Sequence, residues 1–167
     1  MNLFLLRHGL AVERDEFDPA NDADRPLTPK GHRQLRHVAA ALRAMELRFD
    51  AIWSSPLVRA RQTAEIVAAE LKLKKRLAFA AELKPGGCPE KLLHKISQPP
   101  PAVENILFVG HEPDFSELIS RLVAGGSGAS FTLKKGGLAK LALEKFPASN
   151  RATLAWLLTP AQMKLMR

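Results

Sequence analysis

The chain contains very little cysteine and few aromatic residues. Its 167 residues include one cysteine, Cys88, and no tyrosine, and aromatic residues make up only 6% of the total. A single cysteine excludes an intrachain disulfide and is typical of a reducing compartment, so we expect a cytoplasmic protein. No aromatic side chains interleave with the basic ones, which argues against a stacking platform for single-stranded nucleic acid.

Long hydrophobic runs and targeting signals are also missing. No apolar stretch reaches the roughly 18 residues of a membrane span, and Met1–Phe4 lacks the basic region of a signal peptide. We therefore expect no membrane partner. Hydrophobic residues make up 46% of the chain, enough for a core, and the length suits one domain covering residues 1–167. The prolines at 99–101 are interpreted as a surface breaker within that domain.

Positive charge predominates, with 25 Lys and Arg against 17 Asp and Glu and a formal net charge of +8. Such a balance favours anionic partners, namely phosphorylated ligands, acidic proteins or nucleic acid. The densest basic run, Lys72–Arg76, is interpreted as a solvated helix end, where cations suit the helix dipole. Charge is the one feature of the sequence that favours nucleic-acid binding, so we do not expect a nucleic-acid partner.

Apolar and amphipathic segments alternate along the chain, which predicts an α/β fold. Expected strands cover residues 2–7, 51–54, 77–83, 105–109, 138–143 and 152–158. Expected helices begin at Pro29 after a Thr28 cap, at Pro56 after a Ser55 cap, at Pro89 and at Pro113, with a last turn at Thr159-Pro160. This order predicts three layers, with helices on both faces of a mostly parallel mixed sheet whose last two strands are the candidates for antiparallel pairing.

The most informative motif is Leu6-Arg7-His8-Gly9, directly after the first expected strand. Ligands bind at the carboxyl ends of strands in α/β proteins. A histidine there is able to act as a base, a metal ligand or a nucleophile, and an adjacent arginine offers donors suited to phosphate. The alternative is a solvated arginine beside a capping histidine.

Two later segments also follow expected strands. Ser54–Thr63 opens a helix whose free amide groups attract anions, and Arg59 lies one turn in, able to lean back toward the strand end. Val109-Gly110-His111 places a second histidine at a strand end, where Gly110 permits tight backbone geometry. Taken alone, each has an ordinary explanation: a capped helix with exposed arginines, or a histidine bonded to a loop carbonyl.

Together the three segments bring two histidines and at least two arginines to one rim of one sheet. This cationic cluster around a nucleophile candidate indicates phosphoryl transfer, in which a protein mainly positions the phosphate and stabilises its charge. No carboxylate is clearly available to complete a metal shell with His8 and His111, and the arginines repel cations. We expect neither a catalytic metal nor another cofactor.

These three motifs resemble those of the histidine phosphatase superfamily, the phosphoglycerate-mutase-like group. Arg25-Pro26-Leu27-Thr28 and Glu82–Gly87, together with the compact length, are similar to the SixA-type phosphohistidine phosphatases. The resemblance covers nearly the whole chain and implies a phosphoglycerate-mutase-like fold. It further implies that His8 is the nucleophile that becomes phosphorylated, and that Arg7, Arg59 and His111 bind the phosphate oxygens.

The general acid is the least certain part of the predicted site. Many family members carry an acid after the third strand, and Glu82 is the nearest candidate, although a solvent-facing glutamate is the alternative reading. The longer insertion that usually surrounds this acid is absent. A phosphohistidine leaving group is an imidazole with a pKa of about 6.5, so it needs less proton donation than an alkoxide.

The leading hypothesis is therefore a metal-independent phosphatase that hydrolyses phosphohistidine in a protein, for example a histidine-containing phosphorelay domain. One alternative is a phosphatase of small phosphoesters using the same site, and another is a non-catalytic phosphate-binding module. An intact His8 argues against the last, because binding alone needs only arginines. The sequence does not identify the physiological substrate or the oligomeric state.

Overall fold

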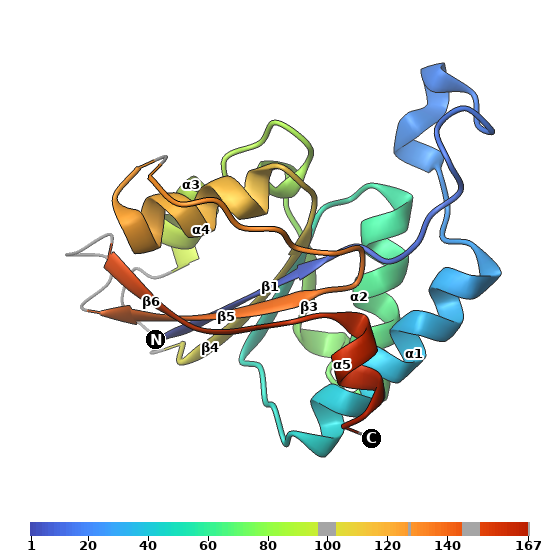
Figure 1. The fold of residues 1–167 in the computed structure, drawn as a ribbon. Coiled ribbons are helices and arrows are strands. Elements are labelled where there is room, and N and C mark those ends of the chain that lie inside the picture. The colour runs from blue at the N-terminus through green and yellow to red at the C-terminus, as the bar shows by residue number, and fades with distance from the viewer. Residues whose placement is uncertain (97–102, 127, 145–150, 167) are drawn as a thin grey trace.

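The computed structural model describes residues 1–96, 103–126, 128–144 and 151–166, so the prolines at 99–101 lie outside the described residues. Six strands form one sheet in the order β3-β2-β4-β1-β5-β6 (Figure 1). They are β1 (Asn2–Arg7), β2 (Ala51–Ser54), β3 (Leu77–Phe79), β4 (Asn105–Gly110), β5 (Leu138–Glu144) and β6 (Arg151–Leu158). The first four strands run parallel, whereas β5 is antiparallel to β1 and to β6, which confirms the predicted mixed sheet.

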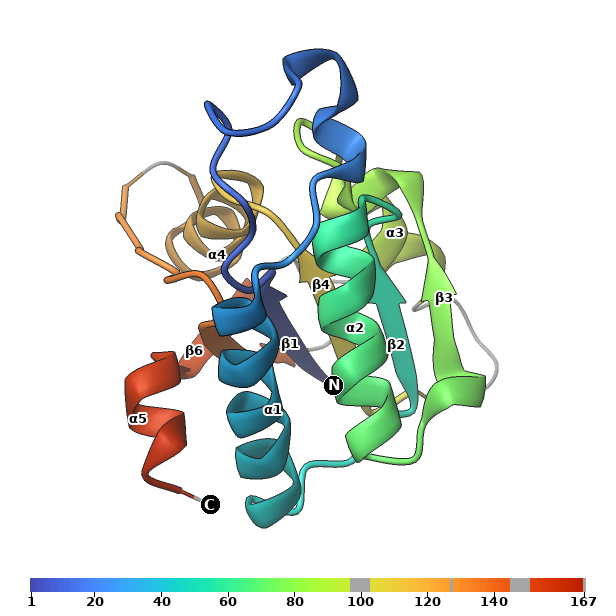
Figure 2. The same cartoon turned by 90° about the vertical axis from the view of Figure 1, so that its right-hand side faces the viewer.

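Helices cover both faces of this sheet (Figure 2). One face carries α1 (Pro29–Ala44), α2 (Val58–Glu70) and α5 (Pro160–Lys164), and the other carries α3 (Pro89–Ile96) and α4 (Asp114–Ala124). The apolar run of β1 serves both layers, since Leu3 and Leu5 join the core under α3 and α4, while Phe4 and Leu6 join the core under α1 and α2. The predicted three-layer architecture is confirmed.

The start of α1 also agrees with its sequence signal. The Thr28 hydroxyl accepts a hydrogen bond from the Gly31 amide at 3.0 Å, and Pro29 occupies the first helical position. A side chain at Gly31 would place its Cβ 2.0 Å from the Leu10 carbonyl oxygen. This glycine therefore lets α1 begin directly against the segment that leaves β1.

Ser55 does not cap α2, contrary to the sequence prediction. The helix begins at Val58, its N-cap residue is Leu57, and no side chain caps it. The Ser55 hydroxyl accepts from the Leu57 amide at 3.3 Å and lies 2.9 Å from the His111 ring. Residues 55–57 are therefore a short connection that turns the chain from β2 into α2, and the hydroxyl points to the rim of the sheet.

The strand predicted over 77–83 is also shorter than expected. β3 ends at Phe79, and Ala81–Leu83 form a 3-10 helix, η3. β3 lies at the edge of the sheet and pairs only with β2, whose last residue, Ser54, lies opposite Phe79. Pairing stops where β2 stops.

In the described part of the chain, no helix is long and apolar enough to cross a membrane.

Candidate active site

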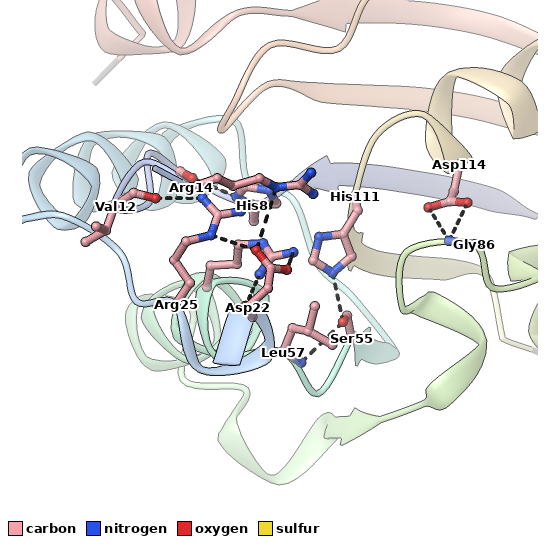
Figure 3. Close-up of polar contacts among 12 residues, drawn as sticks. His8, Val12, Arg14, Asp22, Arg25, Ser55, Leu57, Gly86, His111 and Asp114 are labelled. Carbon is pink, nitrogen blue, oxygen red and sulfur yellow. Dashed lines mark hydrogen bonds and ion pairs between the residues drawn. The ribbon is translucent and has the colours of Figure 1, made fainter. Parts of the chain in front are cut away.

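The two predicted site histidines lie side by side at the carboxyl ends of central strands. His8 follows β1 and His111 follows β4, and the His8 amide donates to the Gly110 carbonyl at 3.0 Å. Their ring centroids are 5.2 Å apart, and both residues are buried (Figure 3). A Cβ on Gly110 would lie 2.6 Å from the Phe115 ring, so glycine is needed here for close packing. The parallel strands thus bring together residues about a hundred positions apart.

His8 is held as a neutral imidazole with one free nitrogen. Its Nδ1 lies 2.8 Å from the Gly9 carbonyl oxygen. Because a carbonyl only accepts, Nδ1 carries the proton and Nε2 keeps its lone pair. The pKa of His8 is lowered to about 3, mainly by burial; His111, Arg59 and Arg7 add to the shift, and the Gly9 hydrogen bond opposes it. This side chain therefore presents a nucleophilic nitrogen at neutral pH.

His111 has the complementary arrangement. Its Nε2 lies 2.9 Å from the Ser55 hydroxyl, which already accepts from the Leu57 amide. We assign the hydroxyl proton to the bond with Nε2, and this assignment places the imidazole proton on Nδ1. Burial and, next, Arg59 lower the pKa of His111 to about 3. The ring is neutral, with a donor at Nδ1.

Arg59 comes from the first turn of α2, and its side chain is only 2% exposed. Its Nη1 donates to the Asp22 carbonyl at 2.8 Å and its Nη2 to the Asp22 carboxylate at 3.1 Å (Figure 3). Asp22 belongs to the 3-10 helix η1 (Pro19–Asp24) and also accepts from Arg25 Nε at 3.0 Å, with Arg14 at 3.7 Å. Burial alone would raise the pKa of Asp22, but the arginines outweigh it and hold this pKa below its usual range.

Asp22 and Arg25 are therefore site residues that sequence reasoning missed. Arg25 is buried and donates from Nη1 to the Val12 carbonyl at 2.6 Å. The sequence contained a partial signal, because Arg25 opens the Arg-Pro-Leu-Thr segment that carries the SixA resemblance. Asp22 had no such signal, since its partner Arg59 lies 37 positions away.

We call Arg7, His8, Arg59 and His111 the pocket residues. Three of these four keep a buried hydrogen-bond donor without a partner among the described residues. Arg7 donates from Nη1 to the Leu133 carbonyl at 2.8 Å. Arg7 Nε, Arg59 Nε and His111 Nδ1 are shielded from solvent and have no hydrogen-bond partner among the described residues. Buried donors are normally satisfied, so three such atoms around one histidine indicate a site for an acceptor-rich anion.

Glu82, the predicted acid, lies apart from these contacts. It sits in η3, half-buried, and nothing in the described ranges joins its carboxylate to a pocket residue by a hydrogen bond or ion pair. The turn that follows instead contacts α4, since the Gly86 amide donates to the Asp114 carboxylate at 3.1 Å. The catalytic role of Glu82 stays a prediction.

The described residues contain no cluster of three or more His, Cys, Asp or Glu side chains placed to hold a metal ion. The donor set of the pocket also suits an anion better than a cation. Two guanidinium groups and two imidazoles line it, and the nearby Asp22 carboxylate is already shared among arginines. The guanidinium groups therefore offer positive charge to an anion at this rim.

Comparisons with known proteins agree with this geometry. Residues 3–85 match the model of the histidine phosphatase superfamily (branch 1). An uncharacterised protein of Picosynechococcus is 38% identical over 139 residues, which are 83% of this chain and 82% of that protein. The chain belongs to the histidine phosphatase superfamily. Phosphohistidine phosphatase SixA of Escherichia coli is 28% identical, covering 100% of this chain and 99% of SixA.

Solved structures place the fold in the same group. A structure of the protein histidine phosphatase SixA complexed with tungstate matches with a TM-score of 0.77 at 28% identity, covering 96% of this chain and 98% of that one. A phosphoglycerate mutase from Bacillus anthracis matches with a TM-score of 0.68 at 18% identity, covering 98% and 95%. The fold is therefore phosphoglycerate-mutase-like, as the motifs predicted.

Proposed function

We propose that this protein hydrolyses phosphohistidine in a protein substrate through a phosphohistidine intermediate on its own His8. The observation that carries the proposal is the set of complementary atoms in the pocket. His8 offers a lone pair at Nε2, while Arg7, Arg59 and His111 each keep a buried donor without a partner in the described part of the chain. A phosphoryl group supplies both the electrophile and the acceptor oxygens that these atoms need.

The reaction proceeds in two displacements. His8 Nε2 attacks phosphorus, and the bond from phosphorus to the leaving group breaks with its electron pair on that group, which takes up a proton. Water then attacks the phosphorylated His8, the bond from phosphorus to Nε2 breaks, and inorganic phosphate leaves. The arginines and His111 stabilise the phosphoryl oxygens in both steps, and no metal ion takes part.

Two further points support phosphohistidine as the substrate. The relative that carries this activity in its name, SixA, matches over the full length of the chain, and the structure similar to this one binds tungstate, a tetrahedral oxyanion. An imidazole leaving group also needs less help from an acid than an alkoxide does, because its conjugate acid has a pKa of about 6.5. The proposal treats residues 1–167 as one catalytic domain.

Trapping the intermediate tests the proposal. After dialysis against a chelator, the protein is mixed with a labelled phosphohistidine domain or peptide and denatured within milliseconds. We expect a label that survives alkali, is lost in acid and maps to the peptide containing His8. H8A should carry none, whereas H32A, altered at a half-buried position of α1 outside the pocket residues, should be labelled normally. An alkali-labile label, or none, overturns the mechanism, and faster turnover of small phosphoesters overturns the substrate assignment.

A further inference from the structure

Glu112 is a carboxyl group at the rim of the pocket that the reaction described above leaves unused. It directly follows His111 at the carboxyl end of β4 and is half-buried. Its Oε1 atom is shielded from solvent and has no hydrogen-bond partner among the residues that the structure describes. A carboxylate oxygen that is buried without a donor is costly, whereas a protonated carboxyl loses much less by burial.

The charges around Glu112 place it beside the pocket. It interacts with Arg7, the neighbour of the nucleophile: burial lowers the pKa of Arg7, and Glu112 acts against that shift. Burial raises the pKa of Glu112 itself, assisted by Asp114 and opposed by Ser116 and Arg7. A carboxyl with a raised pKa keeps its proton closer to neutral pH, as a general acid must.

The comparison with Glu82 favours Glu112. Glu82 follows the edge strand β3, and no hydrogen bond or ion pair within the described ranges links its carboxylate to a pocket residue. Glu112 directly follows His111 in the chain, and the His111 ring lies 5.2 Å from that of His8. Of these two glutamates, only Glu112 has a charge interaction with Arg7 and a buried carboxyl oxygen without a partner among the described residues.

We propose that Glu112 is the proton donor to the leaving group, an inference that rests on the proposed function. As His8 Nε2 forms its bond to phosphorus, the leaving nitrogen or oxygen takes the electron pair of the breaking bond and the proton of Glu112. In the second displacement, the attacking water returns a proton to the Glu112 carboxylate. The bond between phosphorus and Nε2 then breaks, and both residues regain their starting states.

The dependence of rate on leaving-group basicity tests this assignment. A series of aryl phosphates, from 2,4-dinitrophenyl to phenyl phosphate, is hydrolysed by the unaltered protein, by E112Q, by E82Q, which tests the competing assignment, and by the control E117Q, altered at an exposed position of α4. We expect E112Q to lose less than about threefold on the best leaving group and about a hundredfold or more on the poorest, because only the latter needs a proton. E117Q should follow the unaltered protein throughout.

Three outcomes would overturn the inference: equal losses of E112Q on every substrate, a steepened dependence in E82Q, or a dependence already steep in the unaltered protein. The last measurement requires no variant, so misfolding of E112Q leaves the inference testable. Trapped phosphohistidine on His8 with 2,4-dinitrophenyl phosphate is measured in parallel. If the label forms and the leaving-group pattern fails, Glu112 is excluded while the proposed reaction at His8 stands; if no label forms, the proposed function itself fails.

Discussion

Removing the Ser55 hydroxyl should impair catalysis well beyond its effect on stability. Ser54 and Ser55 are adjacent, fully buried and both hydrogen-bonded, yet only Ser55 touches the site. The Ser54 hydroxyl donates to the Ser55 carbonyl at 2.9 Å, whereas the Ser55 hydroxyl lies 2.9 Å from His111 Nε2. The pair S54A and S55A therefore separates loss of a buried hydrogen bond from loss of control over His111.

The magnitudes follow from what each hydroxyl contacts. S54A removes one hydrogen bond, to the Ser55 carbonyl, and S55A removes two, with the Leu57 amide and with His111 Nε2. Each buried polar group left unsatisfied costs about 1–3 kcal/mol of unfolding free energy. In S55A, the His111 proton is no longer fixed on Nδ1, the atom proposed to bind the phosphoryl group. Complete loss of such a donor costs about 3–4 kcal/mol in the transition state. Because S55A frees the proton without deleting the ring, we expect a loss of about tenfold in kcat, or about 1.4 kcal/mol.

Urea unfolding and steady-state kinetics on 2,4-dinitrophenyl phosphate measure the two effects separately. S55A should be destabilised at least as much as S54A, because it loses two hydrogen bonds rather than one, and S54A should keep nearly full kcat. Nitrogen-15 NMR of the His111 ring should show a proton on Nδ1 in the unaltered protein and in S54A, and a mixture of tautomers in S55A. Equal kcat values for the two variants, or an Nε2 proton in the unaltered protein, would refute the reasoning.

Two further predictions concern charge. R59A should lose about a hundredfold or more in kcat/KM and bind vanadate more weakly. R61A, whose half-exposed side chain lies 3.9 Å from Glu65, should stay within about threefold of the unaltered protein. Similar losses in both variants would mean that Arg59 does not bind phosphate. His8 and His111 should not titrate in NMR spectra between pH 8 and 5, because their pKa values lie at about 3. Histidines in the unfolded chain bind protons below about pH 6.5. The contribution of the two neutral rings to the unfolding free energy should therefore be complete above that pH. It should fall toward pH 3 by at most about 1.4 kcal/mol per pH unit for each ring, and an H8A variant with an unchanged slope would contradict this.

The sequence predicted the parts of the fold whose signals are local. Continuous apolar runs such as Leu3–Leu6 are typical of strands buried on both faces, and this run indeed joins both cores. Thr28 and Thr159 cap their helices as expected, the latter with a full capping box. Both histidines follow expected strands, and this position predicted that they lie together, because parallel strands have their carboxyl ends at one edge of the sheet.

The features that the sequence did not predict depend on distant partners. The predicted end of β3 was wrong because strand length there is set by β2, not by local propensity. Ser55 has the composition of a helix cap, but its hydroxyl is bonded to His111, 56 positions away. Asp22 lies in a polar segment without periodicity, and its role appears only when η1 lies against α2. Glu112 carries no signal beyond its position after His111.

The two neutral histidines show how burial and catalysis are coupled in this pocket. Burial is the largest cause of their lowered pKa values, and the arginines proposed to bind phosphate add to it. The features proposed to attract the phosphoryl dianion therefore also keep the proposed nucleophile, His8, unprotonated. It follows that a rate change near pH 6.5 cannot come from His8. We expect it to come from the second ionisation of the phosphoryl group, with a pKa near 6, and Glu112, whose pKa burial raises, is a second group that ionises in this pocket. Since only the Glu112 contribution disappears in E112Q, the pH profile of that variant assigns each limb to its group.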